Sequence, residues 1–403
     1  MNIWIVSLFE PTPVDNTRPM RYIGIADAAI KQGHSITHIA CSFRHSTKVQ
    51  RYQQNHFQTV LERYKLVFVY SEPYHKNLSF QRLKSHRIFT KNLISIIDQL
   101  DKPDIILVAL PPLYTADALT KWGKQKGIKV YVDIIDPWPD VATIIVPKWA
   151  TPIFKLLLTP MYIQLRRILQ NTYGIIAISD EYIRWAKSFG YPVWRSETFL
   201  PSIPMREVQQ KISEIHQKYP RQNTHVLHCV YAGSLGVAYD IPTILKSAAS
   251  LHNSFPGKTL FTIAGSGHYE AMLNEYTQQY PNIKYVGRIG YDDLMHLYAH
   301  ADLGLSQYGK GATQSVTYKF FDYLGAGLPI LNSLMSEMAN LTEKNKVGFN
   351  NQPGDDTTLT ANITCFLQTP GLLGQYKTNA YEYAMEHGNN EIVYKRLVNF
   401  ITD

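Results

Sequence analysis

Short apolar runs alternate with amphipathic stretches of helical length along the whole chain. The apolar runs are rich in Val and Ile, and polar, Gly or Pro residues bound each of them. This alternation predicts parallel β-strands joined by helices that cover both faces of a sheet. The predicted strands of the first half are residues 3–9, 35–41, 65–70, 104–110, 129–135 and 174–179. Those of the second half are residues 225–233, 259–265, 283–287, 303–308 and 328–333.

The alternation restarts once, after the Pro-bearing segment FLPSIPMREV at residues 199–208. A chain of 403 residues is longer than one hydrophobic core usually supports. We therefore predict two doubly wound, Rossmann-like α/β domains with a boundary between Pro201 and Gln222. Ligands of such sheets bind beyond the carboxyl ends of the strands, so functional residues are expected in the turns that follow each strand.

Composition is that of an ordinary globular protein. The chain is 45% hydrophobic and 18% charged, which excludes a disordered or fibrous protein. Cys41, Cys229 and Cys365 are widely spaced, form no metal-ligand pattern and are typical of a reducing cytosol. No apolar run reaches the length of a membrane-spanning helix, and the N-terminal MNIWIVSLF predicts a first buried strand rather than a signal peptide. These features predict a cytoplasmic protein without a metal site.

Basic residues are concentrated in the first half. Residues 1–200 hold 25 Lys and Arg against 15 Asp and Glu, whereas the remainder holds 15 against 17, so the first half contributes +10 and the remainder −2 to the formal net charge of +8. A basic half favours anionic partners such as lipid headgroups or nucleic acid. A soluble domain of high pI has the same composition, and the sequence contains no recognisable nucleic-acid module.

The segment from Gly309 to Leu331 reads as a glycine-containing loop, a helix of about ten residues and a buried strand. Gln314 and Ser315 lie where the helix is predicted to begin, and Gly325 and Gly327 lie where it is predicted to end. The free amides of a helix N-terminus attract an anion, so this loop is a candidate phosphate site.

Lys319 and Asp322 are three residues apart on the same predicted helix and therefore share one face. The cation reinforces an anion site, and the acid can accept hydrogen bonds from sugar hydroxyls. A nucleotide-sugar offers that combination of diphosphate and vicinal hydroxyls. The alternative is an ordinary solvated helix with one Lys and one Asp.

Three further strand ends in the second half carry residues suited to a phosphate. Gly233 and Ser234 follow one predicted strand, Gly265 and Gly267 follow the next, and Arg288 follows the third. Glycines let backbone amides approach an anion closely, and Arg pairs with phosphate oxygens. The glycine spacing lacks the third glycine of a dinucleotide fingerprint, and no P-loop motif occurs. Each turn taken alone is equally well explained as a structural strand-to-helix turn.

The ordered set of these motifs resembles glycosyltransferase family 4, the retaining enzymes of GT-B fold. The matching runs of the second half are YAGSLG, TIAGSGHYEAML, IKYVGRIGYDDLMHLYAHADLGL and KFFDYLGAGLPIL. In the first half, VALPPLYTADALTKWGKQKGIKVYVDIIDPWPD is similar to a strand–helix–strand of the family that ends in Asp-x-Trp-Pro, and GIIAISDEYIRWAKSFG follows it.

The resemblance implies a GT-B fold, in which two Rossmann-like domains face a central cleft. Residues 1–200 would bind the acceptor and residues 201–380 the nucleotide-sugar, and a C-terminal helix at about 381–403 would pack back on the first domain. The implied activity is the retaining transfer of a sugar from a UDP- or GDP-sugar to a hydroxyl of a glycan or lipid-linked acceptor. No metal or other cofactor is expected, and bacterial surface-polysaccharide biosynthesis is the implied pathway.

Residues of the second domain would bind the donor, with Lys319 on the diphosphate and Asp322 on the ribose. The complete expected set is Gly233, Ser234, Gly265, Gly267, Arg288, Lys310, Gln314, Ser315, Lys319 and Asp322. The sequence departs from the family at Gln314, where an acid is usual, and in the turn GVAYD, which lacks the usual basic pair. Arg288, Lys310 and Lys319 would have to neutralise the diphosphate instead.

Two first-half strand ends are candidates for acceptor chemistry. Asp133 and Asp136 close a buried strand in VDIIDPWPD, where charged residues are costly unless they are paired or used. The resemblance places this turn near the reacting centre, so Asp136 is the predicted catalytic group and Asp133 its support, although Asp133 is equally explained as a buried structural acid. The loop after the first strand offers a second candidate, for an acceptor or donor phosphate, with a solvated loop as its alternative. Its residues are Asn16, Thr17, Arg18 and Arg21.

Residues 153–170 are apolar and aromatic with few charges, and residues 76–91 mix basic with aromatic side chains. Such a combination suits peripheral contact with an anionic membrane. The alternative for residues 153–170 is a core helix of the first domain.

Two other classes of protein fit the same residues. Gln314 and the missing basic pair are compatible with a non-catalytic GT-B partner subunit or a sugar-nucleotide-binding protein. A GT-B sugar-nucleotide epimerase is the third alternative.

Overall fold

A computed structural model describes residues 1–15, 20–76, 79–191, 195–221 and 225–403 of the chain. The chain divides into two compact units, the first formed by Met1–Leu200 with Asn390–Asp403 and the second by Pro201–Asn389. The chain crosses between the units twice. The segments beside the two crossings are adjacent, because Ile203 pairs with Asn389 in a parallel bridge and its N–H donates to Gly388 O at 2.9 Å.

The first unit contains an eight-stranded sheet in the order β10-β9-β8-β7-β1-β2-β6-β5. All neighbours are parallel except the hairpin between β5 and β6 at one edge. The strands are β1 Asn2–Ser7, β2 Ser35–Cys41, β5 His56–Leu61, β6 Tyr64–Val69, β7 Ile105–Leu110, β8 Lys129–Ile134, β9 Gly174–Ala177 and β10 Ser196–Thr198. A separate antiparallel pair consists of β3 Phe43–Arg44 and β4 Val49–Gln50.

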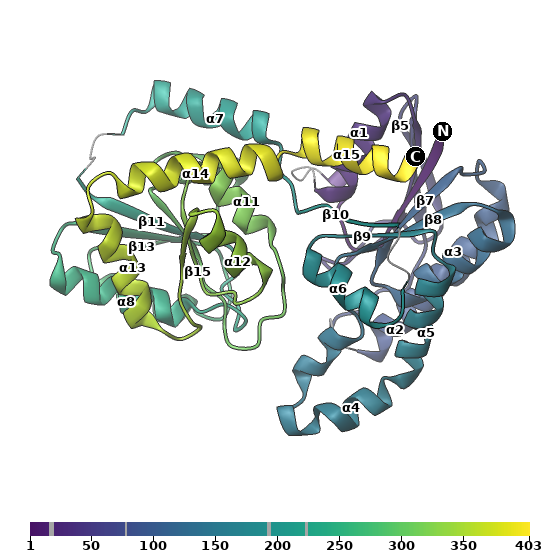
Figure 1. The fold of residues 1–403 in the computed structure, drawn as a ribbon, viewed down its shortest axis with the longest axis horizontal. Helices are drawn as coiled ribbons and strands as arrows, with labels where there is room; N and C mark the ends of the chain where they lie inside the picture. The colour runs from purple at the N-terminus through teal and green to yellow at the C-terminus, as the bar shows by residue number, and fades with distance from the viewer. Residues whose placement is uncertain (16–19, 77–78, 192–194, 222–224) are drawn as a thin grey trace. The chain divides into compact units, whose positions relative to one another are not determined.

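Helices cover both faces of this sheet, as Figure 1 shows. They are α1 Arg21–Lys31, α2 Phe80–Ile96, α3 Leu113–Lys126, α4 Thr151–Leu157, α5 Thr159–Asn171, α6 Asp180–Ser188 and α15 Asn390–Thr402. Short 3-10 turns occur at Pro13–Asp15, Ile97–Gln99, Asp140–Ile145 and Lys148–Ala150. Alternate residues of β1 enter different cores, since Trp4 packs on the α2, α3 and α5 side and Ile3 on the α1 and α15 side.

The second unit contains a six-stranded, wholly parallel sheet in the order β13-β12-β11-β14-β15-β16 (Figure 1). Its strands are β11 Leu227–Ala232, β12 Thr259–Ala264, β13 Ile283–Gly287, β14 Leu303–Ser306, β15 Ile330–Asn332 and β16 Gly348–Asn350. Its helices are α7 Met205–Lys218, α8 Ile241–Ser254, α9 Glu270–Gln279, α10 Tyr291–Ala299, α11 Tyr318–Gly325, α12 Glu337–Lys344, α13 Asp356–Gln368 and α14 Leu372–His387.

Every strand predicted from the apolar runs is present, which confirms the predicted α/β class with parallel sheets. The pattern misses β5, β10 and β16, which lie at sheet edges, where only one neighbour is paired and the apolar signal is weak, and it also misses the two-residue strands β3 and β4. The helix expected over residues 381–403 is interrupted at Gly388 and Asn389, and only the part from Asn390 belongs to the first unit. There, Tyr394 of α15 lies so close to α1 that a Cβ on Gly24 would be 2.4 Å from its ring.

Within the described ranges, no helix is long and apolar enough to cross a membrane.

Candidate functional site

The carboxyl edge of the second sheet brings the predicted donor residues together. The turns after β11, β12 and β13 carry Gly233, Gly265 and Arg288, and these three strands are neighbours in the sheet. The segment after β14, which pairs with β11 on its other side, leads into α11 with Lys319 and Asp322. The parallel topology therefore places residues that are up to 89 positions apart in sequence along one edge.

The glycines of this edge serve close packing between two turns. A Cβ on Gly265 would lie 1.8 Å from Gly233 O, and one on Gly267 would lie 2.8 Å from the carbonyl carbon of Leu235. Their backbone N–H groups are already used, since Gly233 donates to Ala264 O, Gly265 to Gly287 O and Gly267 to the Glu270 carboxylate. These amides are therefore not free to bind a phosphate, whereas Ser234 is exposed in the turn between them.

Helix α11 begins at Tyr318, so the prediction that Gln314 and Ser315 start it is wrong. Ser315 is 1% exposed, and its carbonyl accepts hydrogen bonds from the Ser336 hydroxyl at 2.6 Å and from Met338 N. These bonds hold the chain in a non-helical path before Thr317. Gln314 is exposed in the same segment.

Tyr323 fixes the position of α11, and the sequence gives no signal for that role. Its hydroxyl accepts a hydrogen bond from Ala232 N at 3.0 Å and donates one to Leu305 O at 3.2 Å. A Cβ on Gly304 would lie 2.3 Å from the Tyr323 ring, so glycine in β14 makes room for it. Since Ala232 ends β11 and Leu305 lies in β14, Tyr323 ties the helix to both central strands.

The amino group of Lys319 is buried among three tyrosine rings. Its Nζ lies 4.0 Å from the ring centroid of Tyr231, 5.0 Å from that of Tyr239 and 5.8 Å from that of Tyr308, and it has no hydrogen-bond partner in the part of the chain that the structure describes. Burial lowers the pKa of Lys319 to about 7, against the opposing attraction of Asp322, which is half-buried on the same helix. Lys319 and Asp322 thus share a face of α11, as predicted.

Arg288 and Lys310 are both exposed at this edge. Neither makes an ion pair with another residue of the described ranges. They are cations without a partner, which an anionic ligand can recruit.

In the first unit, Arg21 and Asp133 form a buried ion pair. Arg21 Nε lies 2.7 Å and Arg21 Nη2 3.0 Å from the two Asp133 carboxylate oxygens, and Arg21 Nη1 donates to Phe199 O at 2.8 Å. The side chains are 1% and 0% exposed. Arg21 is therefore not available to an acceptor phosphate, contrary to its predicted role, and Asp133 is the structural acid of the two alternatives. The other predicted residues of that loop, Asn16, Thr17 and Arg18, lie outside the described residues.

Asp136 follows β8 at the carboxyl edge of the first sheet. Burial raises the pKa of Asp136 to about 6, against the opposing charge of Arg82. The Arg82 guanidinium in turn lies 4.8 Å from the ring centroid of Phe9 and 5.9 Å from that of Trp138. A carboxyl group with a pKa near neutrality is suited to take up a proton from a substrate hydroxyl.

Sequence reasoning missed a histidine cluster beside Arg82. His45 Nδ1 lies 2.5 Å from the Tyr74 hydroxyl, and the Phe9 ring meets the rings of both His45 and His86 edge-on. Burial lowers the pKa of His45 to about 4 and that of His86 to about 3, so both imidazoles are neutral at pH 7. His86 is 5% exposed, and no other described residue forms a hydrogen bond with its Nε2. The residues come from the loop after β1, the turn between β3 and β4, the loop after β6 and helix α2, so only the fold brings them together.

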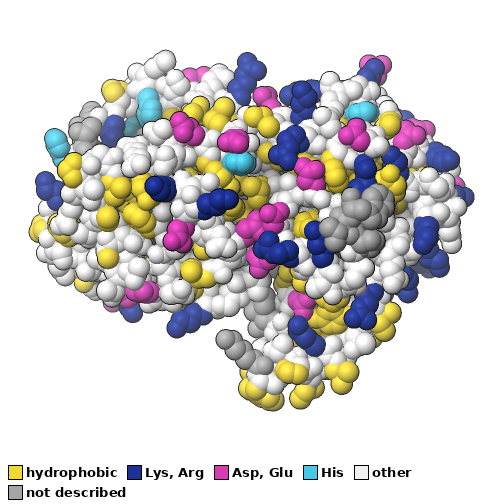
Figure 2. Space-filling model, viewed as in Figure 1, with side chains coloured by type: hydrophobic (Ala, Val, Ile, Leu, Met, Phe, Trp, Pro, Cys, Tyr) yellow, Lys and Arg dark blue, Asp and Glu magenta, His cyan; other side chains and the backbone are white. Residues whose placement is uncertain are grey.

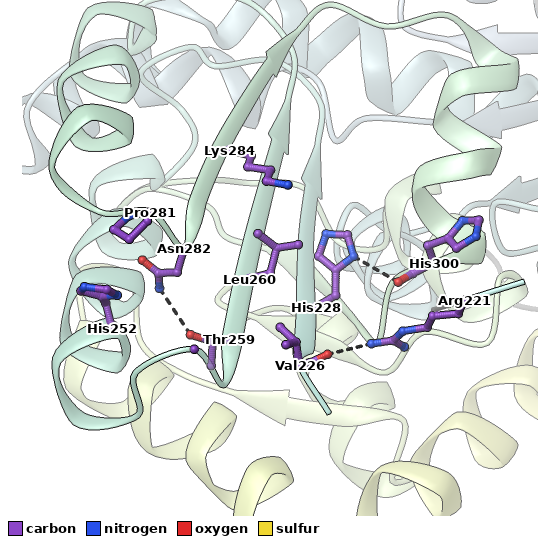
Figure 3. Close-up of a pocket in the computed structure, with 11 residues that line it drawn as sticks. Arg221, Val226, His228, His252, Thr259, Leu260, Pro281, Asn282, Lys284 and His300 are labelled. Carbon is purple, nitrogen blue, oxygen red and sulfur yellow. Dashed lines mark hydrogen bonds between the residues drawn. The ribbon is translucent and has the colours of Figure 1, made fainter. Parts of the chain in front are cut away.

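The pocket in Figure 3 lies at the opposite, amino edge of the second sheet. It has a volume of about 420 Å³ and is built from the first residues of β11, β12 and β13 with neighbouring loops. Its main polar contacts are internal, as His228 Nδ1 lies 3.1 Å from His300 O and Arg221 donates to Val226 O at 2.7 Å. It is therefore separate from the donor residues. Across the described residues, no three His, Cys, Asp or Glu side chains come together as a possible metal site.

Comparison with known proteins adds family evidence for one segment and fold evidence for the whole chain. Residues 243–397 match a family model described as glycosyl transferase-like. No curated protein matches the sequence.

Three solved structures illustrate the likeness in fold. OtsA in its apo form has a TM-score of 0.74 at 13% identity, covering 99% of this chain and 98% of that one. WaaG, a glycosyltransferase involved in lipopolysaccharide biosynthesis, has a TM-score of 0.66 at 15% identity over 100% of both chains. HepE of Anabaena in complex with UDP has a TM-score of 0.67 at 13% identity, again over 100% of both chains. The chain has the GT-B fold, and its glycosyltransferase-like segment lies mostly in the second unit and ends within α15 of the first.

Proposed function

We propose that this protein is a retaining glycosyltransferase that moves a sugar from a UDP- or GDP-sugar to a hydroxyl of a glycan or lipid-linked acceptor. The GT-B fold and the glycosyltransferase-like segment at residues 243–397 support the class of reaction. The observation that carries the donor assignment is on α11, where a buried Lys319 amino group, with no hydrogen-bond partner among the described residues, lies one helical turn from Asp322. HepE, which shares the fold, was solved with UDP and with UDP-glucose.

The donor chemistry follows from the charges of the second unit. Arg288 and Lys310 are exposed cations, and Lys319 is a buried one, so together they offset the charge that develops on a leaving diphosphate. Asp322 accepts hydrogen bonds from ribose hydroxyls. These residues need no metal to stabilise the leaving group, and we propose that none is required.

The acceptor chemistry is assigned to Asp136 of the first unit. With a pKa raised to about 6, its carboxylate is ionised at pH 7 yet basic enough to assist deprotonation of an acceptor hydroxyl. Arg82, held between Phe9 and Trp138, keeps a positive charge near that carboxylate.

Turnover separates the enzyme from its alternatives. Purified protein is incubated with a panel of UDP-, GDP- and dTDP-sugars, with and without lipid-linked acceptors, and products are resolved by mass spectrometry. A transferred sugar whose anomeric configuration, read by proton NMR coupling, matches the donor supports a retaining transferase. An isomerised nucleotide-sugar without an acceptor indicates an epimerase. Binding of nucleotide without any conversion across the panel indicates a non-catalytic binder and refutes the enzyme.

We further propose that the first unit contacts an anionic membrane through α4 and that the acceptor is lipid-linked, as in bacterial surface-polysaccharide synthesis. No residue of α4 is buried, and hydrophobic side chains gather over it at one tip of the first unit (Figure 2). Trp149, Ile153, Leu156 and Leu157 are between 63% and 78% exposed. By contrast, Leu165, Ile168 and Leu169 of α5 are buried, so the core-helix alternative holds for α5 and not for α4.

Charge next to this tip favours anionic lipid over neutral lipid. Ile163 and Arg167 are four residues apart on α5, so the face that continues the apolar tip becomes basic one turn later. This basic part of α5 lines a groove of about 740 Å³ between α2, α3 and α5. The cationic side chains that line the groove are Arg87, Lys91, Lys121, Lys124 and Arg167. Basic residues beside exposed apolar ones are the pattern of an interfacial surface.

Sedimentation with vesicles tests the membrane surface. We expect the protein to pellet with vesicles of equal parts phosphatidylcholine and phosphatidylglycerol, and the Leu156→Glu/Leu157→Glu variant to lose at least about tenfold in binding, given roughly 1.5–3 kcal/mol per buried Leu. Ile392→Glu, which changes an exposed residue of α15, is the matched control and should bind normally. Equal binding of all three proteins would refute the α4 surface.

A further inference from the structure

The Lys319 amino group is an unusual component for the interior of a protein. The Lys319 residue is half-buried as a whole, but its Nζ is buried and has no hydrogen-bond partner among the described residues, which is rare for a lysine amino group. The only charged group that acts on it from the described residues is Asp322, which lies on the same helix. The other neighbours are the faces of three tyrosine rings.

The three tyrosines around the amine, Tyr231, Tyr239 and Tyr308, form a cage. Two loops close around the amine to build this cage. Tyr231 lies near the end of β11, and Tyr239 pairs with Tyr308 in an antiparallel bridge between the turns after β11 and β14. Gly309 N donates to Ala238 O at 2.8 Å across the same bridge. The rings of Tyr239 and Tyr308 lie 5.3 Å apart and those of Tyr231 and Tyr239 6.4 Å apart.

The phenols of the cage stay protonated near neutral pH, so none of them supplies a counter-charge. Burial raises the pKa of Tyr308 to about 12, and it raises the pKa of Tyr231 and of Tyr239 as well. The Tyr231 hydroxyl donates to Ser234 O at 2.6 Å, which ties the cage to the turn above it. Exclusion of water from the cage thus disfavours the protonated form of the Lys319 amine, while the ring faces orient the ammonium ion once the amine is protonated.

The amine lies directly beneath the proposed donor turn. A Cβ on Gly233 would be 2.9 Å from Lys319 Nζ, and Gly233 itself is exposed with φ +154°. A diphosphate bound over this turn would therefore place negative charge close to the amine, with only the glycine backbone between them. A second anionic neighbour favours the protonated amine, since opposite charges at short range stabilise one another.

We propose that the tyrosine cage positions Lys319 as an amine that is largely uncharged in the free protein at about pH 8, and that binding of the donor diphosphate over Gly233 draws a proton from solvent onto it. The proton adds to the Nζ lone pair, and the diphosphate diester of the donor remains a dianion. Tyr231, Tyr239 and Tyr308 are positioning residues in this scheme. The inference rests on the proposed donor site, and it adds a pH dependence that the transferase activity alone does not require.

Burial lowers the pKa of Lys319 to about 7, which sets the size of the effect. At about pH 8 roughly nine-tenths of the amines are then neutral, so binding should take up about 0.9 proton per donor molecule. Above that pH the dissociation constant should rise about tenfold per pH unit. A lysine that is charged in the free protein would show neither behaviour.

Calorimetry with UDP-glucose measures this uptake, because its diphosphate diester does not itself titrate near neutral pH. The binding enthalpy is measured in phosphate, HEPES and Tris buffers, and its slope against the buffer ionisation enthalpy gives the protons taken up. Lys319→Arg should bind without uptake, because guanidinium is always charged. Tyr239→Phe should keep the uptake, whereas Tyr239→Ala should reduce it by opening the cage to water. A slope of zero for the unmodified protein, with binding intact, would overturn the proposal.

A measurement without ligand keeps the two proposals distinguishable. The protein is labelled with ¹³C at lysine Cε, and the Lys319 signal is assigned as the one that disappears in Lys319→Arg. A titration midpoint near 7 supports the cage, and a midpoint near the ordinary lysine value overturns it whether or not a nucleotide-sugar binds. Failure of UDP-glucose and GDP-glucose to bind a protein with a midpoint near 7 would instead refute the proposed donor site, and the proton uptake on donor binding with it.

Discussion

Truncation of Asp133 to alanine should destabilise the first unit strongly, because it leaves the Arg21 guanidinium buried and without its counter-ion. Both side chains are at most 1% exposed, and two hydrogen bonds of 2.7 and 3.0 Å join them. Breaking a buried ion pair by removal of one partner costs about 3–5 kcal/mol. That is a large share of the roughly 5–15 kcal/mol that stabilises a typical domain.

Tryptophan fluorescence makes the measurement selective for this unit. All six tryptophans of the chain lie within the first 200 residues, so their emission during urea unfolding reports only that part of the molecule. We expect the urea midpoint of Asp133→Ala to fall by roughly 1–5 M, given a loss of about 3–5 kcal/mol and slopes of about 1–3 kcal/mol per M. The change should be independent of any nucleotide-sugar.

Two controls test the reasoning. Lys65 pairs with Asp101 at the surface, where the side chains are 54% and 68% exposed, so Lys65→Met should cost no more than about 1 kcal/mol. The double variant Arg21→Met/Asp133→Leu removes both charges and should lose less stability than Asp133→Ala alone. A loss below about 1 kcal/mol for Asp133→Ala would refute the structural assignment and reopen a catalytic one.

Three further variants probe the two strand edges. Asp136→Asn should abolish transfer without weakening donor binding, and the rate of the unmodified enzyme should fall as the pH drops through about 6, where the carboxylate is protonated. Because folding raises the pKa of Asp136, its protonated carboxyl group stabilises the folded protein at low pH, and this contribution to the free energy of unfolding is lost as the pH rises through about 6. Asp136→Asn should therefore also have a higher melting temperature than the unmodified protein at about pH 8. Gly265→Ala should abolish nucleotide binding by calorimetry because its Cβ would lie 1.8 Å from a carbonyl oxygen, whereas Gly257→Ala, also at positive φ but with nothing within 4 Å, should bind normally. Tyr323→Phe leaves the N–H at the end of β11 unpaired and should lower the free energy of unfolding by about 1–3 kcal/mol in circular dichroism; no change would show that water replaces the hydroxyl.

The periodicity of the chain predicted the fold well because parallel strands are buried on both faces. That burial demands continuous runs of Val, Ile and Leu, as in residues 105–110, and such runs are visible in one sequence. The position of Asp136 at a strand end was equally readable. The start of α11 was not, because the backbone bonds of Ser315 to Ser336 and Met338 come from another turn of the chain.

At the carboxyl edges of both sheets, some residue contacts follow from sequence spacing and others only from the fold. Lys319 and Asp322 are three apart in sequence, so helical geometry alone puts them on one face. The sequence by itself thus determined where the strands lie along the chain, the division into two domains and the placement of a cation and an acid on one face of a helix. Only the tertiary structure decided that Arg21 neutralises Asp133 instead of facing a substrate, and that three tyrosines enclose Lys319. The physical reason is that burial and charge partnership depend on which distant strand ends meet, and a linear pattern does not record those encounters.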